Sequence, residues 1–406
     1  MEPLQNSATQ RPRSSPVSLS SALFLTIMTL GYAVYAVDRL VLSAVLSPMS
    51  SSLHFSSAEI GLIGSAQYIG VLCVVFLAGY LSDRLGRWRI MMIGIAIFTA
   101  FTWVIGLSSS FTEAFLFRLV SGLGEGLFWP SAMAWVASYY EKNKGLSLGI
   151  FYVGFDAGGA AGLSIGGISY YLTQDWRAAF FIAPLLGLIV MGGAYAFKGR
   201  FKALRQEIGV RIGRESFALL RNKQILLLAV FAFLATWGSV WQAVFLPYYF
   251  TKALGYGVAF AALISTVVTI SGAAGKVSLG WVSDRWGRRN RLLAVTSFLV
   301  VVSYGLFFST SASSFLILLC ASVCMGFFSA AIFPVMQSVM ADSSPEDRLG
   351  TGLGISTSAQ SVATVLSPII AASLFTLGVG KAIALDATIP MLISIPLALA
   401  LRDRKN

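Results

Sequence analysis

The sequence predicts an all-α integral membrane protein with twelve transmembrane helices in two six-helix halves that run parallel to each other. Of its 406 residues, 56% are hydrophobic and only 11% are charged, whereas soluble proteins carry roughly 25% charged residues. The apolar residues form long runs, and residues 292–341 contain no charge at all. Because one span needs about 20 apolar residues, this run is long enough for two spans and a tight turn. A third observation is an internal repeat, which is described below.

The apolar runs, broken at charges, Gly and Pro, define the expected domains. Residues 1–20 are rich in Ser, Pro and Gln, and we expect a disordered cytoplasmic tail there. Two six-helix bundles follow at 21–197 and 225–401, joined by a basic linker at 198–224, with a C-terminal tail at 402–406. The twelve expected spans are 21–47, 58–81, 90–108, 112–139, 145–171, 177–197, 225–250, 257–281, 291–309, 313–341, 349–376 and 380–401.

The basic residues predict the orientation of these spans. If the N-terminus is cytoplasmic, 23 of the 29 Lys and Arg fall on the cytoplasmic side, and three (Arg177, Lys252 and Lys381) fall on the other. Positive residues favour the cytoplasmic side, so both termini are expected there, in a bacterial inner membrane. The net charge of +12 is thereby explained by topology, and no nucleic-acid partner is expected.

The repeat lies in two short loops and the helices that follow them. GYLSDRLGR at 79–87 and GWVSDRWGR at 280–288 share six of nine residues, and Pro130, Gly145 and Gly149 are matched by Pro334, Gly350 and Gly354. The glycines permit a tight turn. The loop resembles the signature loop of the major facilitator superfamily, and the resemblance implies that family's fold. It also implies a cytoplasmic latch that forms in one conformation and breaks in another, built from Gly79, Asp83, Arg84, Gly86, Arg87, Gly280, Asp284, Arg285, Gly287 and Arg288. The alternative is that these basic residues only fix the topology.

Six ionisable residues are the clearest ones at membrane depth in the predicted spans, where each costs roughly 3 kcal/mol or more and is therefore a functional candidate. The repeat places uncharged residues opposite four of them, so the fold itself does not require those charges. We infer that the charges handle substrate or ions. The six are Asp38, Arg39, Arg118, Glu125, Asp156 and Lys276, and the uncharged counterparts of the last four are Ser322, Ser329, Ser361 and Val75.

Other polar residues are interpreted structurally. Glu59 and Glu113 are expected to cap helix starts, and Asp386 is expected at the interface near the outer end of the last span. The three cysteines, all in apolar runs, are expected to be small packing residues; they are Cys73, Cys320 and Cys324.

Two segments carry a narrower resemblance. Y-x-x-D-R-x-x-L-S at 35–43 and RLVSGLGEGLFWPS at 118–131 are similar to the first and fourth spans of the anion:cation symporter family. The resemblance implies proton coupling for Asp38 and Glu125. It implies anion binding, or control of those carboxylates, for Arg39 and Arg118. Asp156 is added to the proton-coupling group as a third carboxylate at membrane depth.

The physical chemistry of these groups supports the same roles. A low dielectric favours the neutral form of a carboxylate, and a nearby guanidinium favours the charged form, so an anion that occupies the guanidinium frees the carboxylate to take a proton. Tyr35 lies one turn before Arg39 and either adds a hydroxyl to the substrate site or packs there. Lys276 either binds the substrate carboxylate from the opposite half or forms an ion pair with Asp156.

The sequence therefore predicts a monomeric transporter that imports a small organic anion together with protons. Its partners are that anion, protons and the lipid bilayer; no cofactor, metal or enzymatic activity is expected. One feature supports an alternative. The fifth span has the glycine pattern of antiporter-type exporters, with Leu163 where Pro is expected, and this favours a proton-antiporting exporter of drugs or metabolites. A third possibility is a membrane protein that senses rather than transports.

Overall fold

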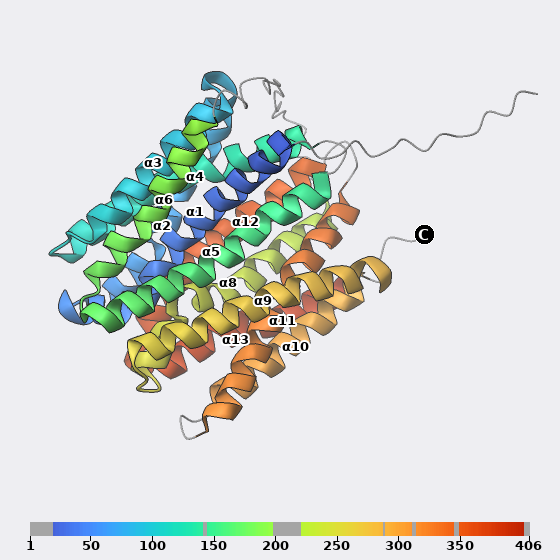
Figure 1. The fold of residues 1–406 in the computed structure, drawn as a ribbon. Helices are drawn as coiled ribbons and strands as arrows, with labels where there is room; N and C mark the ends of the chain where they lie inside the picture. The colour runs from blue at the N-terminus through green and yellow to red at the C-terminus, as the bar shows by residue number, and fades with distance from the viewer. Residues whose placement is uncertain are drawn as a thin grey trace, which may run out of the picture.

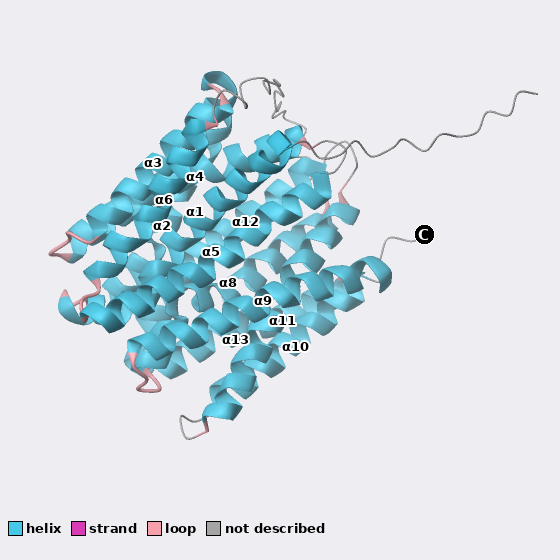
Figure 2. Ribbon diagram, in the orientation of Figure 1, coloured by secondary structure: helices cyan, strands magenta, loops and turns pink. Residues whose placement is uncertain are grey.

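The computed structural model describes residues 19–140, 144–197, 221–286, 289–310, 314–344 and 349–401. All regular structure in these ranges is helical (Figure 2). The expected tails, apart from Leu19 and Ser20, and residues 198–220 of the expected linker lie outside the described residues.

Twelve long α-helices run side by side through the described ranges (Figure 1). This number and order are those the sequence predicts. A short 3-10 helix, η4 (Leu374–Leu377), separates the last two. The long helices are α1 (Leu19–Ser52), α2 (Ser57–Leu85), α3 (Arg87–Ile105), α4 (Phe111–Tyr139), α5 (Lys144–Thr173), α6 (Arg177–Ala196), α8 (Lys223–Lys252), α9 (Val258–Trp286), α10 (Arg289–Ser309), α11 (Phe315–Ser343), α12 (Leu349–Ser373) and α13 (Val379–Ala400).

Eleven of these helices, within the described residues, are long and apolar enough to cross a membrane. The remaining one is α4, which carries Glu113, Arg118 and Glu125. It packs against both α2 and α3, and its inner charges Arg118 and Glu125 are buried. The structure therefore keeps those two charges away from lipid by surrounding them with protein. The chain is a multi-pass membrane protein.

The starts of α2 and α4 are capped as the sequence predicts. The Ser56 hydroxyl accepts from the Glu59 backbone N–H, and the Glu59 carboxylate accepts from the Ser56 backbone N–H at 2.7 Å. At α4, the Ser110 hydroxyl accepts from the Glu113 N–H at 3.3 Å, and the Glu113 carboxylate accepts from the Ser109 backbone N–H at 2.8 Å. Each pair satisfies helix N–H groups that have no partner within the helix.

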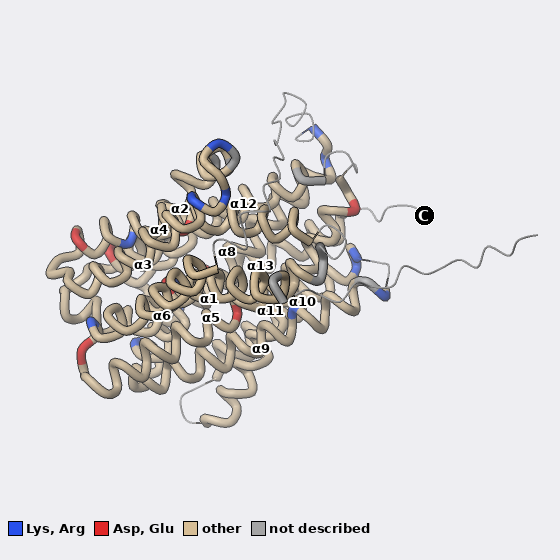
Figure 3. Tube along the Cα trace, turned by 45° about the horizontal axis from the view of Figure 1, so that its top comes forward, with Lys and Arg blue, Asp and Glu red and all other residues tan. Residues whose placement is uncertain are grey.

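The two ends of the bundle differ in charge. We call the end that carries Arg84, Arg87, Arg285 and Arg289 the basic end; the turns at 53–56, 106–110 and 174–176 lie at the opposite end. Figure 3 shows charged residues gathered toward the helix ends and sparse along the middle of the bundle. Gly86 joins α2 to α3 at the basic end with φ of +93°, a conformation that favours glycine.

Contacts between α1–α6 and α8–α13 concentrate toward the opposite end. The Ser65 hydroxyl donates to the Val365 carbonyl at 2.8 Å, joining α2 to α12. The Ser43 hydroxyl donates to the Val244 carbonyl at 3.1 Å, joining α1 to α8. Ser164 and Thr266 join α5 to α9 with hydroxyls 3.3 Å apart. We propose that these two groups of six helices are the bundles predicted at 21–197 and 225–401.

The prediction that the cysteines are packing residues is wrong for all three. Cys73, Cys320 and Cys324 are exposed on the outside of the helices. Lipid tails are as apolar as a protein interior, so an apolar run does not distinguish an inward face from an outward one.

Candidate functional site

A buried pair of carboxylates lies between α1, α2 and α4. Asp38 is 3% exposed and Glu125 is fully buried. The two nitrogen-bound hydrogens of the Gln67 amide are divided between them, with Nε2 2.6 Å from Asp38 Oδ2 and 2.7 Å from Glu125 Oε1. The Gln67 side chain of α2 therefore links Asp38 and Glu125, which are two of the three residues predicted to couple protons.

Asp38 accepts two further hydrogen bonds. The Ser121 hydroxyl of α4 donates to Oδ2 at 2.5 Å, and the Thr102 hydroxyl of α3 donates to Oδ1. Four helices thus meet at one carboxylate, which forms no ion pair within the described part of the chain. Asp38 is stabilised by neutral donors rather than by a cation in contact with it.

Glu125, in contrast, has a cation in direct contact. Arg39 Nε lies 2.7 Å from Glu125 Oε2. The Arg39 side chain is 15% exposed, so it is the more accessible partner. Its guanidinium lies over the rings of Tyr35 and Tyr68, 4.5 and 4.7 Å from their centroids. Cation–π contacts of this kind stabilise a poorly hydrated cation. The predicted shared face of Tyr35 and Arg39 is confirmed.

Arg118 is buried and contacts the backbone of α1. Its Nη2 donates to the Arg39 carbonyl at 3.0 Å, and its Nη1 lies 3.4 Å from the Asp38 carbonyl. Its Nε has no hydrogen-bond partner in the described residues. Together with Arg39 it balances the charges of Asp38 and Glu125, so the cluster is neutral as a whole when all four are ionised.

The other six helices contain a neutral version of this cluster. Gln242, Tyr304 and Ser329 occur 202 to 204 positions after Asp38, Thr102 and Glu125. The Gln242 amide donates to the Tyr304 hydroxyl at 2.9 Å and accepts from the Ser329 hydroxyl at 3.1 Å. The repeat therefore preserves a polar contact between the corresponding helices of the two halves, and charged side chains take part in it only in the first half.

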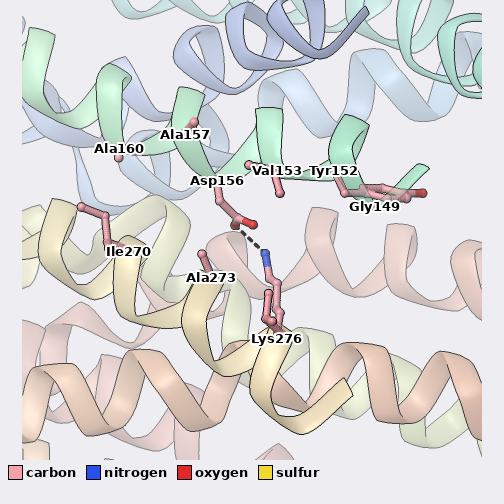
Figure 4. A pocket seen from close by; sticks show the side chains of 10 residues that line it. Gly149, Tyr152, Val153, Asp156, Ala157, Ala160, Ile270, Ala273 and Lys276 are labelled. Carbon is pink, nitrogen blue, oxygen red and sulfur yellow. Dashed lines mark hydrogen bonds and ion pairs between the residues drawn. The ribbon is translucent and has the colours of Figure 1, made fainter. Parts of the chain in front are cut away.

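Asp156 and Lys276 form the alternative ion pair that the sequence left open. Lys276 Nζ lies 2.6 Å from Asp156 Oδ1. Figure 4 shows the two side chains pointing toward each other from α5 and α9 into a cavity of about 370 Å³. Its walls are otherwise mostly apolar and include Val153, Ile270 and Val277. The cavity does not include Arg39 or Arg118.

An aromatic bridge connects the cavity to the buried cluster. Lys276 Nζ lies 6.0 Å from the centroid of the Phe155 ring. The Phe155 ring is 6.2 Å from the Tyr35 ring, and Tyr35 carries the Arg39 guanidinium on its face. The three predicted anion-binding residues thus do not line one cavity. Lys276 lines it, Arg39 is linked to Lys276 through the Tyr35 and Phe155 rings, and Arg118 contacts the Arg39 backbone.

The described latch residues contact their own half of the protein. Arg87 donates to the Ser138 hydroxyl at 2.6 Å and to the Ala134 carbonyl at 3.2 Å, which ties α3 to the end of α4. Arg84 donates to the Tyr80 hydroxyl, and Arg285 lies 3.8 Å over the Trp281 ring. The described part of the chain does not include Gly287, Arg288, the side chains of Asp83 and Asp284, or the surroundings of Gly79. A Cβ added at Gly280 would lie 3.9 Å from Pro334.

The structure adds one residue that the sequence analysis missed and the burial of another. Gln67 carries no charge and lies in an apolar run, so nothing in its type or spacing marked it. Asp386, which was expected at the interface, is 5% exposed and accepts from the Trp237 indole N–H at 2.8 Å, so protein side chains cover it.

Comparisons with known proteins support the transporter assignment. A gentisate transporter of Corynebacterium glutamicum is 24% identical over 384 residues, covering 91% of this chain and 85% of that protein. The Agnestins efflux protein of Paecilomyces divaricatus is 25% identical over 325 residues, covering 74% and 68%. The chain is therefore similar both to a transporter of an organic acid and to an efflux protein.

A solved structure has the same fold. It is a bacterial homologue of the human lysosomal transporter Spinster in an inward-facing, unoccupied conformation, with a TM-score of 0.76, 17% identity, and coverage of 95% of this chain and 96% of that one. The family model described as Major Facilitator Superfamily matches residues 28–245 and 225–406, which together span nearly the whole sequence. The chain therefore belongs to the Major Facilitator Superfamily and is a transporter, not an enzyme.

Proposed function

We propose that this transporter imports a small organic anion together with protons, by alternating access in a bacterial inner membrane. The observation that carries the proposal is the Arg39–Glu125 pair, in which the cation is partly accessible and the carboxylate is fully buried. The similarity to an organic-acid transporter supports the substrate class.

The pair links anion binding to proton binding. An incoming carboxylate competes with Glu125 for the Arg39 guanidinium, which prefers to bind carboxylates through two parallel hydrogen bonds. Glu125 then keeps only its contact with Gln67. A buried carboxylate without a cation is strongly destabilised, so Glu125 takes up a proton as the anion binds. The anion and the proton then cross together.

The membrane potential makes this coupling useful for import. Inward movement of an anion opposes a negative-inside potential by about 2.3 kcal/mol per charge per 100 mV. A single co-transported proton cancels that charge, and a second one makes the step favourable. In this scheme Asp38 shares the Gln67 amide with Glu125, so protonation of one carboxylate alters the hydrogen bonds of the other.

We assign Lys276 and Asp156 to the movement of the two halves. Among the hydrogen bonds described between α1–α6 and α8–α13, theirs lies nearest the basic end, because Asp156 and Lys276 lie farther along α5 and α9 toward that end than Ser164 and Thr266. If the basic end is cytoplasmic, as the positive-inside rule predicts, the halves are closed outside and held at mid-depth by this pair. An anion that binds Lys276 replaces Asp156 and loosens the pair.

Transport in reconstituted vesicles tests the direction. The probe is the organic acid that most stabilises the purified protein in a thermal-shift screen that includes gentisate. We expect uptake when the outside is more acidic than the lumen, and loss of accumulation when a protonophore is added. Accumulation driven only by the opposite gradient, with the protein oriented inside-out, would identify an exporter and contradict the proposal.

The glycine pattern that favoured an exporter has a structural explanation. A Cβ added at Gly158 would lie 2.0 Å from the Ala33 carbonyl oxygen, and one at Gly162 would lie 2.8 Å from that of Val37. These glycines let α5 approach α1 closely, as small residues do in any membrane bundle. The pattern therefore gives no separate support to the exporter.

A further inference from the structure

Asp386 is a buried carboxylate that the scheme above does not use. It lies on α13 and is held between α8 and α12, where Oδ1 is 2.8 Å from Trp237 Nε1 and Oδ2 is 3.0 Å from Ser367 Oγ. It is 5% exposed. Residues 180–183, which occupy 203 to 206 positions earlier, are Phe, Phe, Ile and Ala. The fold itself therefore does not need a carboxylate here.

No cation neutralises Asp386 within the described residues. It forms no described ion pair, and α12 contains no charged residue. The charged residues of the other packed helices lie far along them: Lys223 and Lys252 at the two ends of α8, and Arg289 and Arg291 at the start of α10. Lys381 of α13 is exposed and five positions away.

The titratable residue of α10 near Asp386 is Tyr304, and its hydroxyl hydrogen already takes part in another hydrogen bond. Its hydroxyl donates to the Gly238 carbonyl at 2.8 Å and accepts from the Gln242 amide. A hydroxyl has one hydrogen, so none is available for Asp386. An ionised Asp386 would thus be a buried charge without a cation, which is strongly unfavourable.

A count of hydrogens at Ser367 leads to the same conclusion. Its Oγ lies 3.0 Å from Asp386 Oδ2 and 3.2 Å from the Trp237 carbonyl oxygen. Both neighbours are acceptors if Asp386 is ionised, and the single serine hydrogen cannot fully satisfy both. If Asp386 is neutral, its own O–H donates to Ser367 and the serine donates to Trp237. Every contact then contains one hydrogen.

We propose that Asp386 is a second proton-binding site, which holds a proton in the conformation seen here and releases it during the transport cycle. Release of the proton during transport rests on the proton coupling proposed above, whereas the presence of the bound proton does not depend on that coupling.

The release step follows from where Ser367 lies. It is adjacent to Pro368 and two residues from Val365, and both neighbours contact α2: the Val365 carbonyl accepts from Ser65, and a Cβ on Gly61 would lie 2.8 Å from the Pro368 carbonyl oxygen. This is the stretch of α12 that closes the opposite end. If α12 also shifts relative to α13 as it moves away from α2, Ser367 moves with α12, and the neutral Asp386 loses its acceptor.

Infrared difference spectroscopy of the reconstituted protein tests the bound proton directly. The Asp386→Asn variant keeps the shape of a neutral acid, with an oxygen toward Trp237 and an NH₂ toward Ser367, so it is expected to fold. The wild-type minus variant spectrum should contain the carbonyl stretching band of a protonated carboxyl group. Carboxylate bands in its place would overturn the proposal. Because Asp38 and Glu125 are present in both samples, they cancel.

Two further variants test whether the carbonyl band comes from Asp386. Ser367→Ala removes the acceptor of the acid's hydrogen, so the carbonyl band should move to higher frequency. Ser394→Ala, on the same helix as Asp386 and bonded only to the Met391 carbonyl among the described contacts, should leave it in place. A carbonyl band whose frequency is unchanged in Ser367→Ala would contradict the proposed hydrogen bond from the Asp386 O–H to Ser367.

The proton-to-substrate ratio tests the release. In vesicles supplied with the organic acid chosen by thermal shift, Asp386→Asn should transport one proton fewer per substrate than the wild type. An unchanged ratio would overturn the release step. If the wild type moves no protons at all, the proposed symport fails and the release step with it, while the infrared result still decides whether Asp386 is protonated.

Discussion

Glu125 is fully buried, and its carboxylate is in direct contact with one guanidinium, that of Arg39. Removing that guanidinium leaves a buried carboxylate with only the Gln67 amide as a donor. We therefore expect Arg39→Ala to destabilise the protein by about 3 kcal/mol, the lower end of the cost of breaking a buried pair, because Arg39 is partly exposed. Denaturation of the detergent-solubilised protein measures this.

The double variant Arg39→Ala, Glu125→Gln separates the charge from the packing. Since it removes both charges, it should recover most of the lost stability, whereas Lys381→Ala, at an exposed position, should change stability by less than about 0.5 kcal/mol. If the double variant is as unstable as Arg39→Ala alone, the lost side-chain volume is the cause and the uncompensated charge is not.

At the residue scale, the sequence identified the charged members of the site but not their partners. Asp38, Arg39, Arg118 and Glu125 stand out because charge is rare in an apolar run. The residues that bind them, Gln67 and Thr102, carry no charge, and only the packing of α2 and α3 brings them to the carboxylates. The burial of Asp386 was not predicted because distance from a helix end does not show which neighbours cover a side chain.

At the scale of elements, the close contact of α5 with α1 depends on glycine at defined positions. A methyl group on Gly158 would lie 2.0 Å from a backbone oxygen, while one on Gly149, in the same helix, would meet nothing within 4 Å. Gly158→Ala should therefore destabilise the protein by about 1–3 kcal/mol, as overpacking does. Thermal unfolding compares the two variants.

The matched control is Gly149→Ala, which should be neutral or slightly stabilising since it lowers the entropy of the unfolded chain. Equal destabilisation by both variants would mean that loss of glycine flexibility, rather than a clash with α1, is the cause. In that case the antiporter-like interpretation of this pattern would regain support.

Helix order was predicted well because membrane helices are set by long apolar runs and their breaks. The linker was expected to end at 224, and α8 begins at Lys223. The contacts between helices could not be predicted in the same way, since lipid and protein present similar apolar surroundings to a side chain. The outward position of the cysteines shows this limit at the scale of a helix face.

At the scale of the whole molecule, the Asp156–Lys276 pair joins α1–α6 to α8–α13 through α5 and α9. We expect Asp156→Asn to widen the separation of α5 and α9 at the basic end, because Lys276 loses its described ion-pair partner. Exchanging the two charges, with Asp156→Lys and Lys276→Asp, should restore the wild-type separation.

Spin labels at positions 149 and 278, in a background without the three cysteines, measure that separation. Position 149 has open space around it and Ser278 is exposed, so the labels should perturb little. A distance distribution that is the same in the wild type, the single variant and the exchanged variant would show that the pair does not hold the halves.

The central claim is that Glu125 couples proton movement to anion movement, and one comparison tests it most directly. Uptake driven by a proton gradient and exchange of labelled for unlabelled anion are measured in the same vesicles for the wild type and Glu125→Gln. The amide side chain of this variant cannot change its charge, so we expect gradient-driven uptake to be lost while exchange continues. Gradient-driven accumulation at the wild-type level in Glu125→Gln would contradict the claim.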